Sequence, residues 1–143
     1  MQSLLTYRGT IYPWHCDHIG HMNNMWYAGK FDEASWNLLL QIGITPGYLR
    51  ESAKGMAAVE QVTTFKNELK AGDSVEVVTE LLEVRERVVR FVHTMLNAET
   101  GAECATCRIT GVHVDMTSRR ACPLPQLQLR MARDMLGGLS AAA

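Results

Sequence analysis

The sequence predicts an α+β fold in which one long helix is buried against an antiparallel sheet of about five strands. Residues 23–42 carry apolar side chains at helical spacing, over a surface wide enough for burial on more than one side. After Gly55 the pattern changes to strands rich in Val, Thr and Leu. A long helix beside such a sheet is an α+β arrangement.

Size and composition favour one domain that spans residues 1–143, a common domain length. The 14 basic and 15 acidic residues give a net charge of −1, which does not favour a nucleic-acid partner. No apolar run approaches the roughly 18 residues of a membrane span. The first ten residues lack the pattern of a secretory signal, so we expect a cytoplasmic protein whose four cysteines are thiols.

The first elements are delimited by local signals. Pro13 ends a first strand, and an irregular loop follows to about residue 22. Asn23 or Asn24 supplies the N-cap of the long helix, and Gly43 is placed to stop it. The expected elements are a strand at 4–12, the helix at 23–42, a turn and short helix at 45–51, strands at 56–69, 73–85, 88–97 and 103–116, and a terminal helix at 124–136.

Turn sequences separate the four later strands, which are therefore expected to form a meander. The separators are KAGD, the tight turn RER and AETGAE. Pro123 and Pro125 precede the terminal helix, and residues 137–143 are expected to be frayed. One helix cannot cover the whole sheet, and the sheet has edges to protect, which predicts a dimer in which two sheets join.

The loop before the long helix carries the main chemical signal, in the run PWHCDHIGHMNNMWY at 13–27. Asp17 lies about six residues before a helix N-terminus, which offers free N–H groups and the positive end of the helix dipole. Acyl transfer needs such a base or nucleophile beside preorganised donors for an oxyanion. Gly20 allows the loop backbone to approach a ligand closely. In the alternative, Asp17 caps a turn and Asn23 merely caps the helix.

A metal site is a second interpretation of the same loop. His15, His18 and His21 recur every three residues and are competent zinc or iron ligands. Gly20 argues against the helical conformation that would bring them together, and no later cluster completes a ligand set. We therefore expect no metal.

Several other side chains are candidates for substrate contacts. Glu60 alternates with Met56 and Ala58, which places it on the more apolar face of its strand. Arg85 and Arg87 flank a hairpin turn, where they form either a phosphate contact or a solvated turn. The candidates for substrate binding are Gly20, Trp14, His18, Tyr27, Glu60, Thr63, Arg85 and Arg87.

The run WHCDHIGHMNNMWYAGKFDEASW at 14–36 resembles the signature of the hot-dog-fold acyl-CoA thioesterases, in the branch similar to 4-hydroxybenzoyl-CoA thioesterase. ELKAGDSVEV at 68–77 resembles a later element of that family, and the resemblance covers roughly residues 5–116. The matching positions in the first run are Asp17, Gly20, His21, Asn23, Asn24, Tyr27, Phe31, Glu33 and Ala34.

The resemblance implies a central helix wrapped by a five-stranded antiparallel sheet, in dimers with one continuous sheet that commonly pair into tetramers. It implies an acyl-CoA substrate held between protomers and no cofactor beyond the CoA of that substrate. Asp17 would act as nucleophile or general base, and the N–H near Asn24 would polarise the thioester carbonyl. Asn23 or Asn24 would orient the loop, and His21 would hold Asp17 or bind substrate.

Two other functions remain open at this point. One is a non-hydrolytic hot-dog enzyme, an enoyl thioester hydratase or dehydratase, and the other is a domain that binds acyl-CoA without turning it over. His15, Cys16 and His18 depart from the usual surroundings of the Asp, so the acyl groups of relatives do not transfer. The three Trp together with Glu60 would suit a cationic acyl group.

Overall fold

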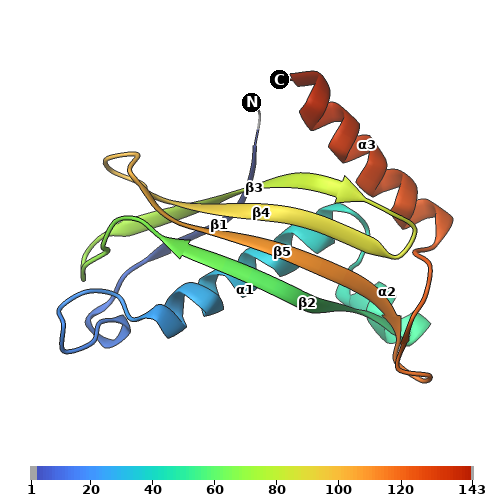
Figure 1. Ribbon diagram of the computed structural model, residues 1–143, viewed down its shortest axis with the longest axis horizontal. Coiled ribbons are helices and arrows are strands. Elements are labelled where there is room, and N and C mark those ends of the chain that lie inside the picture. The colour runs from blue at the N-terminus through green and yellow to red at the C-terminus, as the bar shows by residue number, and fades with distance from the viewer. Residues whose placement is uncertain (1–2, 143) are drawn as a thin grey trace.

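A curled antiparallel sheet wraps around one long helix in the computed structural model, which describes residues 3–142 (Figure 1). The predicted α+β class is confirmed. The elements are β1 (Leu4–Thr10), a 3₁₀ turn (Pro13–His15), α1 (Asn24–Gln41), α2 (Pro46–Ser52), β2 (Lys54–Phe65), β3 (Ser74–Val84), β4 (Val88–Asn97), β5 (Glu103–Asp115), the two-residue β6 (Arg120–Ala121) and α3 (Gln126–Ala142).

The strand order is β1-β3-β4-β5-β2, so the predicted meander is wrong for β2. β2 pairs with β5 at the far edge of the sheet, and not with β3. The reason is that residues 66–73 form a crossover rather than a hairpin turn. Leu69 in this crossover is fully buried, and its carbonyl accepts a hydrogen bond of 2.7 Å from the Met22 amide.

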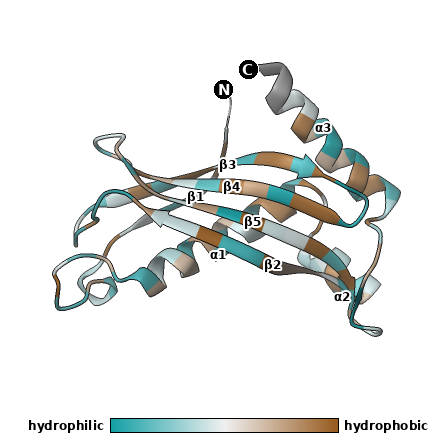
Figure 2. Cartoon of the chain, viewed as in Figure 1, coloured by the Kyte–Doolittle hydropathy of each residue, from teal (hydrophilic) through white to brown (hydrophobic). Residues whose placement is uncertain are grey.

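The core lies between α1 and the concave face of the sheet. Along β4 every second residue is buried, and the strands show alternating hydrophobic and hydrophilic bands (Figure 2). Tyr27, Phe31, Ala34 and Leu38 form the stripe of α1 that packs on this face. Burial of each large apolar side chain stabilises the fold by about 1.5–3 kcal/mol.

Both predicted end signals of α1 are confirmed. Asn23 is the N-cap, and its Oδ1 accepts a hydrogen bond of 3.0 Å from the Met25 amide. The helix ends before Gly43, whose φ of +83° is a left-handed conformation that favours glycine. The position and direction of α1 are therefore specified locally.

The two edges of the sheet differ. β1 is a strand of 7 residues, whereas β2 has 12 residues and exposes Val59, Val62 and Phe65. Among residues 3–142, β2 pairs only with β5. A long apolar edge strand of this kind is a template for pairing with another chain.

The terminal helix α3 packs against β3 and continues past residue 136 as far as Ala142, through the stretch predicted to be frayed. Ala143 lies outside the described residues. None of the described helices is long and apolar enough to cross a membrane.

Candidate functional site

The loop before α1 is a compact, hydrogen-bonded structure. The Asp17 amide donates to the His21 carbonyl at 3.1 Å, and the Gly20 amide donates to the Asp17 carbonyl at 3.0 Å. Gly20 has a φ of +98°, which a glycine adopts without strain. An isolated antiparallel β-bridge between the backbones of Cys16 and Met22 closes the loop at its base. Asp17 is thus held at a defined place beside the start of α1.

Both carboxylate oxygens of Asp17 accept hydrogen bonds. The Ile19 amide donates to Oδ1 at 2.9 Å, and the Asn23 side-chain amide donates to Oδ2 at 3.0 Å. Because these bonds favour the charged form, they lower the pKa of Asp17, the bond from Asn23 most of all. Asp17 is therefore a carboxylate at neutral pH.

Asn23 joins this carboxylate to the amino end of α1. Its side-chain oxygen caps the Met25 amide and its side-chain nitrogen binds Asp17, while its backbone carbonyl accepts from the Trp26 amide at 3.0 Å. The Asn24 amide has no acceptor within the described part of the chain. A free amide at the positive end of a helix is a donor for a developing oxyanion.

A depression of about 260 Å³ opens beside this helix end, between α1 and the last residues of β2. His21, Asn24 and Tyr27 line it, together with Phe65 and Glu68. Tyr27 packs edge-on against Phe65, and burial raises the pKa of Tyr27 to about 12. The structure thus brings the candidates Asp17, Gly20, His21, Asn23, Asn24 and Tyr27 into one region.

Trp14 lies apart from this depression. Its ring stacks on Tyr12 with 4.4 Å between ring centroids, and 65% of it is exposed on the β1 side of α1. His15 is buried against Trp26, and its Nδ1 accepts a hydrogen bond from the Tyr12 amide. His18 is exposed on the loop. Between residues 3 and 142 no three His, Cys, Asp or Glu side chains converge as a metal site.

The expectation that Glu60 shares a face with Met56 and Ala58 is wrong. A β-bulge at Val59 inserts one extra residue, so that Ala58 pairs with Gly111 and Glu60 with the next residue, Thr110. Glu60 therefore faces the convex side of the sheet. Thr63 lies on the concave side, where its hydroxyl contacts the Cys107 sulfur at 3.4 Å.

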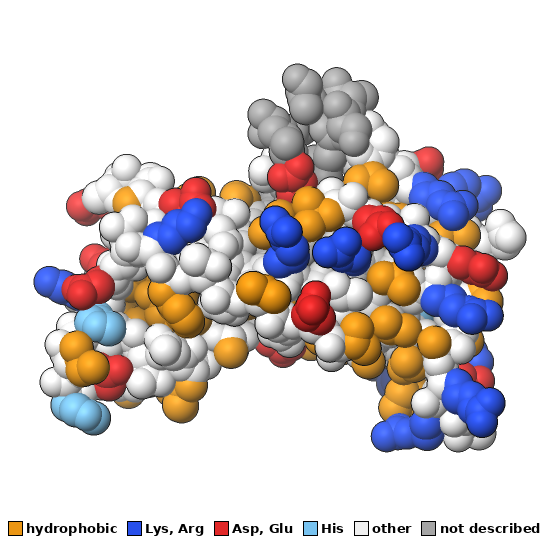
Figure 3. All heavy atoms as spheres, viewed as in Figure 1, with side chains coloured by type: hydrophobic (Ala, Val, Ile, Leu, Met, Phe, Trp, Pro, Cys, Tyr) orange, Lys and Arg blue, Asp and Glu red, His pale blue; other side chains and the backbone are white. Residues whose placement is uncertain are grey.

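Arg85 and Arg87 lie at the other end of the sheet, in the turn between β3 and β4 (Figure 1). The Arg85 side chain forms an ion pair with Glu83. Histidine side chains gather at the end of the molecule where the Asp17 loop lies, and Lys and Arg side chains gather at the opposite end (Figure 3). Within one protomer these arginines do not join the candidate site.

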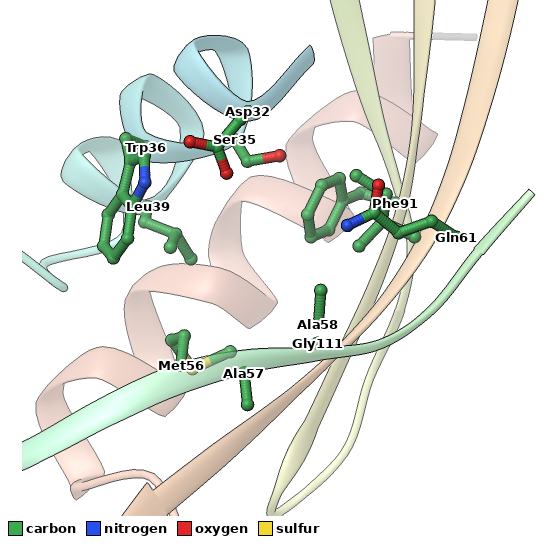
Figure 4. A pocket seen from close by; sticks show the side chains of 11 residues that line it. Asp32, Ser35, Trp36, Leu39, Met56, Ala57, Ala58, Gln61, Phe91 and Gly111 are labelled. Atoms are coloured by element: carbon green, nitrogen blue, oxygen red, sulfur yellow. The ribbon is translucent and has the colours of Figure 1, made fainter. Parts of the chain in front are cut away.

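A cavity that the sequence did not predict lies beside the middle of α1 (Figure 4). Asp32, Ser35 and Trp36 line it from the helix, and Gln61 and Phe91 face them from the sheet. The sequence signal was present, since positions i, i+3 and i+4 share one helix face. The remaining lining residues are Leu39, Met56, Ala57, Ala58, Ile109 and Gly111.

A chain of hydrogen-bonded polar groups, of which Ser35 is half-buried and the others are buried, runs behind this cavity. Ser35 Oγ lies 2.9 Å from His93 Nε2, His93 Nδ1 lies 2.6 Å from the Thr79 hydroxyl, and that hydroxyl lies 2.7 Å from the Thr6 hydroxyl. Burial lowers the pKa of His93 to about 4, so the ring is neutral at physiological pH.

Comparisons with known proteins fit this arrangement. A family model described as the Thioesterase-like superfamily matches residues 11–131. An L-carnitine dehydrogenase/betainyl-CoA thioesterase of Agrobacterium fabrum is 32% identical over 114 residues, which are 80% of this chain and 23% of that protein. This chain therefore spans about a quarter of the length of that relative.

A betainyl-CoA thioesterase of Pseudomonas aeruginosa is 27% identical over 122 residues, which are 85% of this chain and 77% of that protein. Among solved structures, a Staphylococcus aureus protein in complex with CoA matches with a TM-score of 0.89. It is 19% identical, and the match covers 96% of this chain and 87% of the other. That likeness shows a shared fold.

Proposed function

Because this chain belongs to the thioesterase-like superfamily, we propose that it hydrolyses an acyl-CoA thioester to a carboxylic acid and free CoA. The observation that carries the proposal is the Asp17 carboxylate, which is ionised and tied through Asn23 to the amino end of α1. The relatives named as thioesterases support the same substrate class.

In the proposed reaction the thioester carbonyl oxygen accepts a hydrogen bond from the Asn24 amide, at the positive end of α1. Stabilisation of the developing oxyanion at such a site contributes about 3–4 kcal/mol to lowering the barrier. The C–S bond breaks, and the CoA thiolate leaves and takes a proton from water. No metal or cofactor beyond the CoA of the substrate takes part.

Asp17 has two possible roles in this scheme. As a nucleophile it forms a mixed anhydride with the acyl group, which water then hydrolyses to free acid and carboxylate. As a general base it takes a proton from the attacking water. A single turnover in ¹⁸O-water separates the roles, because incorporation of ¹⁸O into the Asp17 carboxylate indicates the anhydride.

The proposal includes a homodimer joined through β2. Its exposed edge has 12 residues, and antiparallel pairing of two copies would give one continuous sheet. Pairing of such dimers into tetramers stays a prediction from the family resemblance. A cytoplasmic location is also proposed, since all four cysteines are free thiols, as is usual in a reducing compartment.

A small cationic acyl group is the proposed substrate class. The two relatives are named for the betainyl group, a trimethylammonium joined by one methylene to the thioester carbonyl. We propose the same class of substrate, a small acyl group with a positive charge, for this chain.

The test is release of free thiol from a panel of acyl-CoA thioesters with a thiol-detecting reagent. Turnover by the wild type together with its loss in Asp17→Asn supports the proposal. An unsaturated thioester whose absorbance changes without thiol release would instead identify a hydratase. Tight acyl-CoA binding with neither change would identify a binding domain.

A further inference from the structure

The cavity beside the middle of α1 is lined by residues to which the proposed reaction assigns no role. It measures about 80 Å³, room for a few non-hydrogen atoms. Trp36 stands on the helix side and Phe91 on the sheet side, with the open space between them (Figure 4). Among the described residues that line it, Asp32 is the only one with an ionisable side chain.

The charge of this cavity is negative. Asp32 is exposed and forms no ion pair with another described residue, and no Lys, Arg or His lines the walls. His93, which lies behind Ser35, is neutral because burial lowers its pKa to about 4. Nothing in the walls offsets the carboxylate.

The walls suit one type of cation better than others. Aromatic faces attract a cation through their quadrupole, and a nearby carboxylate adds to that attraction. A primary ammonium has three N–H donors and needs as many acceptors, whereas most of the lining residues are apolar and only Asp32, Ser35 and Gln61 carry polar side chains. A quaternary ammonium has no N–H donor, and its methyl groups pack on apolar surfaces such as Trp36, Met56 and Phe91.

We propose that this cavity binds a quaternary ammonium group at the acyl end of the thioester, between Trp36 and Phe91 and beside the Asp32 carboxylate. The inference rests on the proposed thioesterase activity and on the proposed β2 dimer, and it assigns the residues that select the substrate.

The dimer matters because of distance. Asp32 is eight residues from Asn24 along α1, which is about 12 Å and too far for a betainyl group bound within one protomer. Phe65 at the end of β2 contacts Tyr27 near the amino end of α1, whereas Met56 near the start of β2 lines the cavity. Antiparallel pairing sets the end of one β2 against the start of the other, which brings the amino end of α1 in the second copy to this cavity.

Two thioesters test this proposal. Betainyl-CoA and 3,3-dimethylbutanoyl-CoA have the same shape and differ only in a central nitrogen cation or carbon. We expect the wild type to favour betainyl-CoA in kcat/KM by at least about tenfold, the scale of a desolvated cation–aromatic contact. Equal kcat/KM values for the two would overturn the proposal.

Variants test which side chains cause the preference for betainyl-CoA. Asp32→Asn and Trp36→Leu should each lower the ratio of the two kcat/KM values by about five- to tenfold. Glu33→Gln removes the neighbouring carboxylate of α1, which lies on the β1 side, and should leave the ratio unchanged. If Asp32→Asn lowers both kcat/KM values equally, the carboxylate serves the reaction and the cation site is wrong.

A binding measurement separates this inference from the activity itself. Tetramethylammonium chloride is titrated into ¹⁵N-tryptophan-labelled dimer, with the Trp36 indole signal assigned from Trp36→Phe. The Trp36 signal should shift in the wild type and not in Asp32→Asn, and tert-butanol should have no such effect. An unmoved signal overturns the site. An enzyme that binds tetramethylammonium yet releases no thiol leaves the site standing and refutes the proposed activity.

Discussion

Two loops at opposite ends of the sheet each hold an aspartate in nearly the same way (Figure 1). Oδ1 of Asp17 accepts from the backbone amide of Ile19, two residues on, and Oδ1 of Asp115 accepts from that of Thr117. The difference lies in the second oxygen. Oδ2 of Asp17 meets a neutral amide, whereas Oδ2 of Asp115 meets the Lys54 ammonium at 2.8 Å.

This single difference separates Asp17, the proposed reactive group, from Asp115, which has a structural role. Lys54 is the main cause that lowers the pKa of Asp115 to about 2, and the pair is electrically neutral. Asn23 orients Asp17 and lowers its pKa, but because its amide is neutral it does not offset the negative charge. A carboxylate that is to attack or to take a proton needs orientation without neutralisation.

The largest expected effect is on turnover by Asp17→Asn. The fold should persist, because the side chain keeps an acceptor for the Ile19 amide, and kcat should fall by at least about 100-fold. Thiol release measures this, with circular dichroism to confirm the fold. The matched change Asp115→Asn should keep wild-type turnover. Wild-type kcat in Asp17→Asn would remove the distinction between the two loops.

Loss of the amide donor should have an intermediate effect. Asn23→Ser keeps an N-cap oxygen but loses the bond to Asp17, and we expect kcat/KM to fall by about tenfold because the carboxylate is no longer oriented. Asn23→Ala loses the cap as well, which should lower the free energy of unfolding by a further ~1 kcal/mol. Urea unfolding measures the capping role of Asn23, and the kinetics measure its role in orienting Asp17. Equal unfolding free energies for Asn23→Ser and Asn23→Ala would contradict this division.

The pH profile of kcat/KM tests the hydrogen bond from the Asn23 side chain to Asp17. In the wild type the acid limb should lie below the ordinary pKa of aspartate, because hydrogen bonds to Asp17 favour its charged form. Removal of the Asn23 donor should raise that pKa, so the acid limb of Asn23→Ser moves to higher pH. Superimposable profiles would show that this bond does not set the titration of Asp17, or that Asp17 is not the group that titrates in kcat/KM.

The smallest expected effect is on stability, at Asp115. Its lowered pKa means that its contribution is present above the ordinary value of 3.8 and is lost as pH falls through about 2. Asp115→Asn should therefore lower the urea midpoint at neutral pH, and the difference from wild type should shrink as the pH falls from 3.8 to about 2. A difference independent of pH would exclude the ion pair as its cause.

Local sequence was sufficient to predict the region around Asp17. Asp17, Gly20 and Asn23 lie within seven residues, and their arrangement follows from a turn, a left-handed glycine and a helix cap. The same holds for the ends of α1. These features depend on neighbours in the chain, which is why spacing alone identified them.

Features that depend on distant pairing were beyond the sequence. β2 lies beside β5 because residues 66–73 form a crossover, although their sequence is typical of a turn. The bulge at Val59 moves Glu60 to the opposite face of the sheet. The acidic group that lines an aromatic cavity is instead Asp32, on the helix. A cationic acyl group is therefore still proposed, but the carboxylate that would bind it is Asp32 and not Glu60.

The bond between the Met22 amide and the Leu69 carbonyl has a consequence for regulation by concentration. The segment that follows β2 anchors, through this bond, the loop that holds Asp17, the proposed reactive carboxylate. If the proposed β2 dimer separates into single chains, this strand loses its partner, and the segment that anchors the loop becomes less constrained. Specific activity should then decline on dilution in step with dissociation, so that the amount of protein itself acts as the switch.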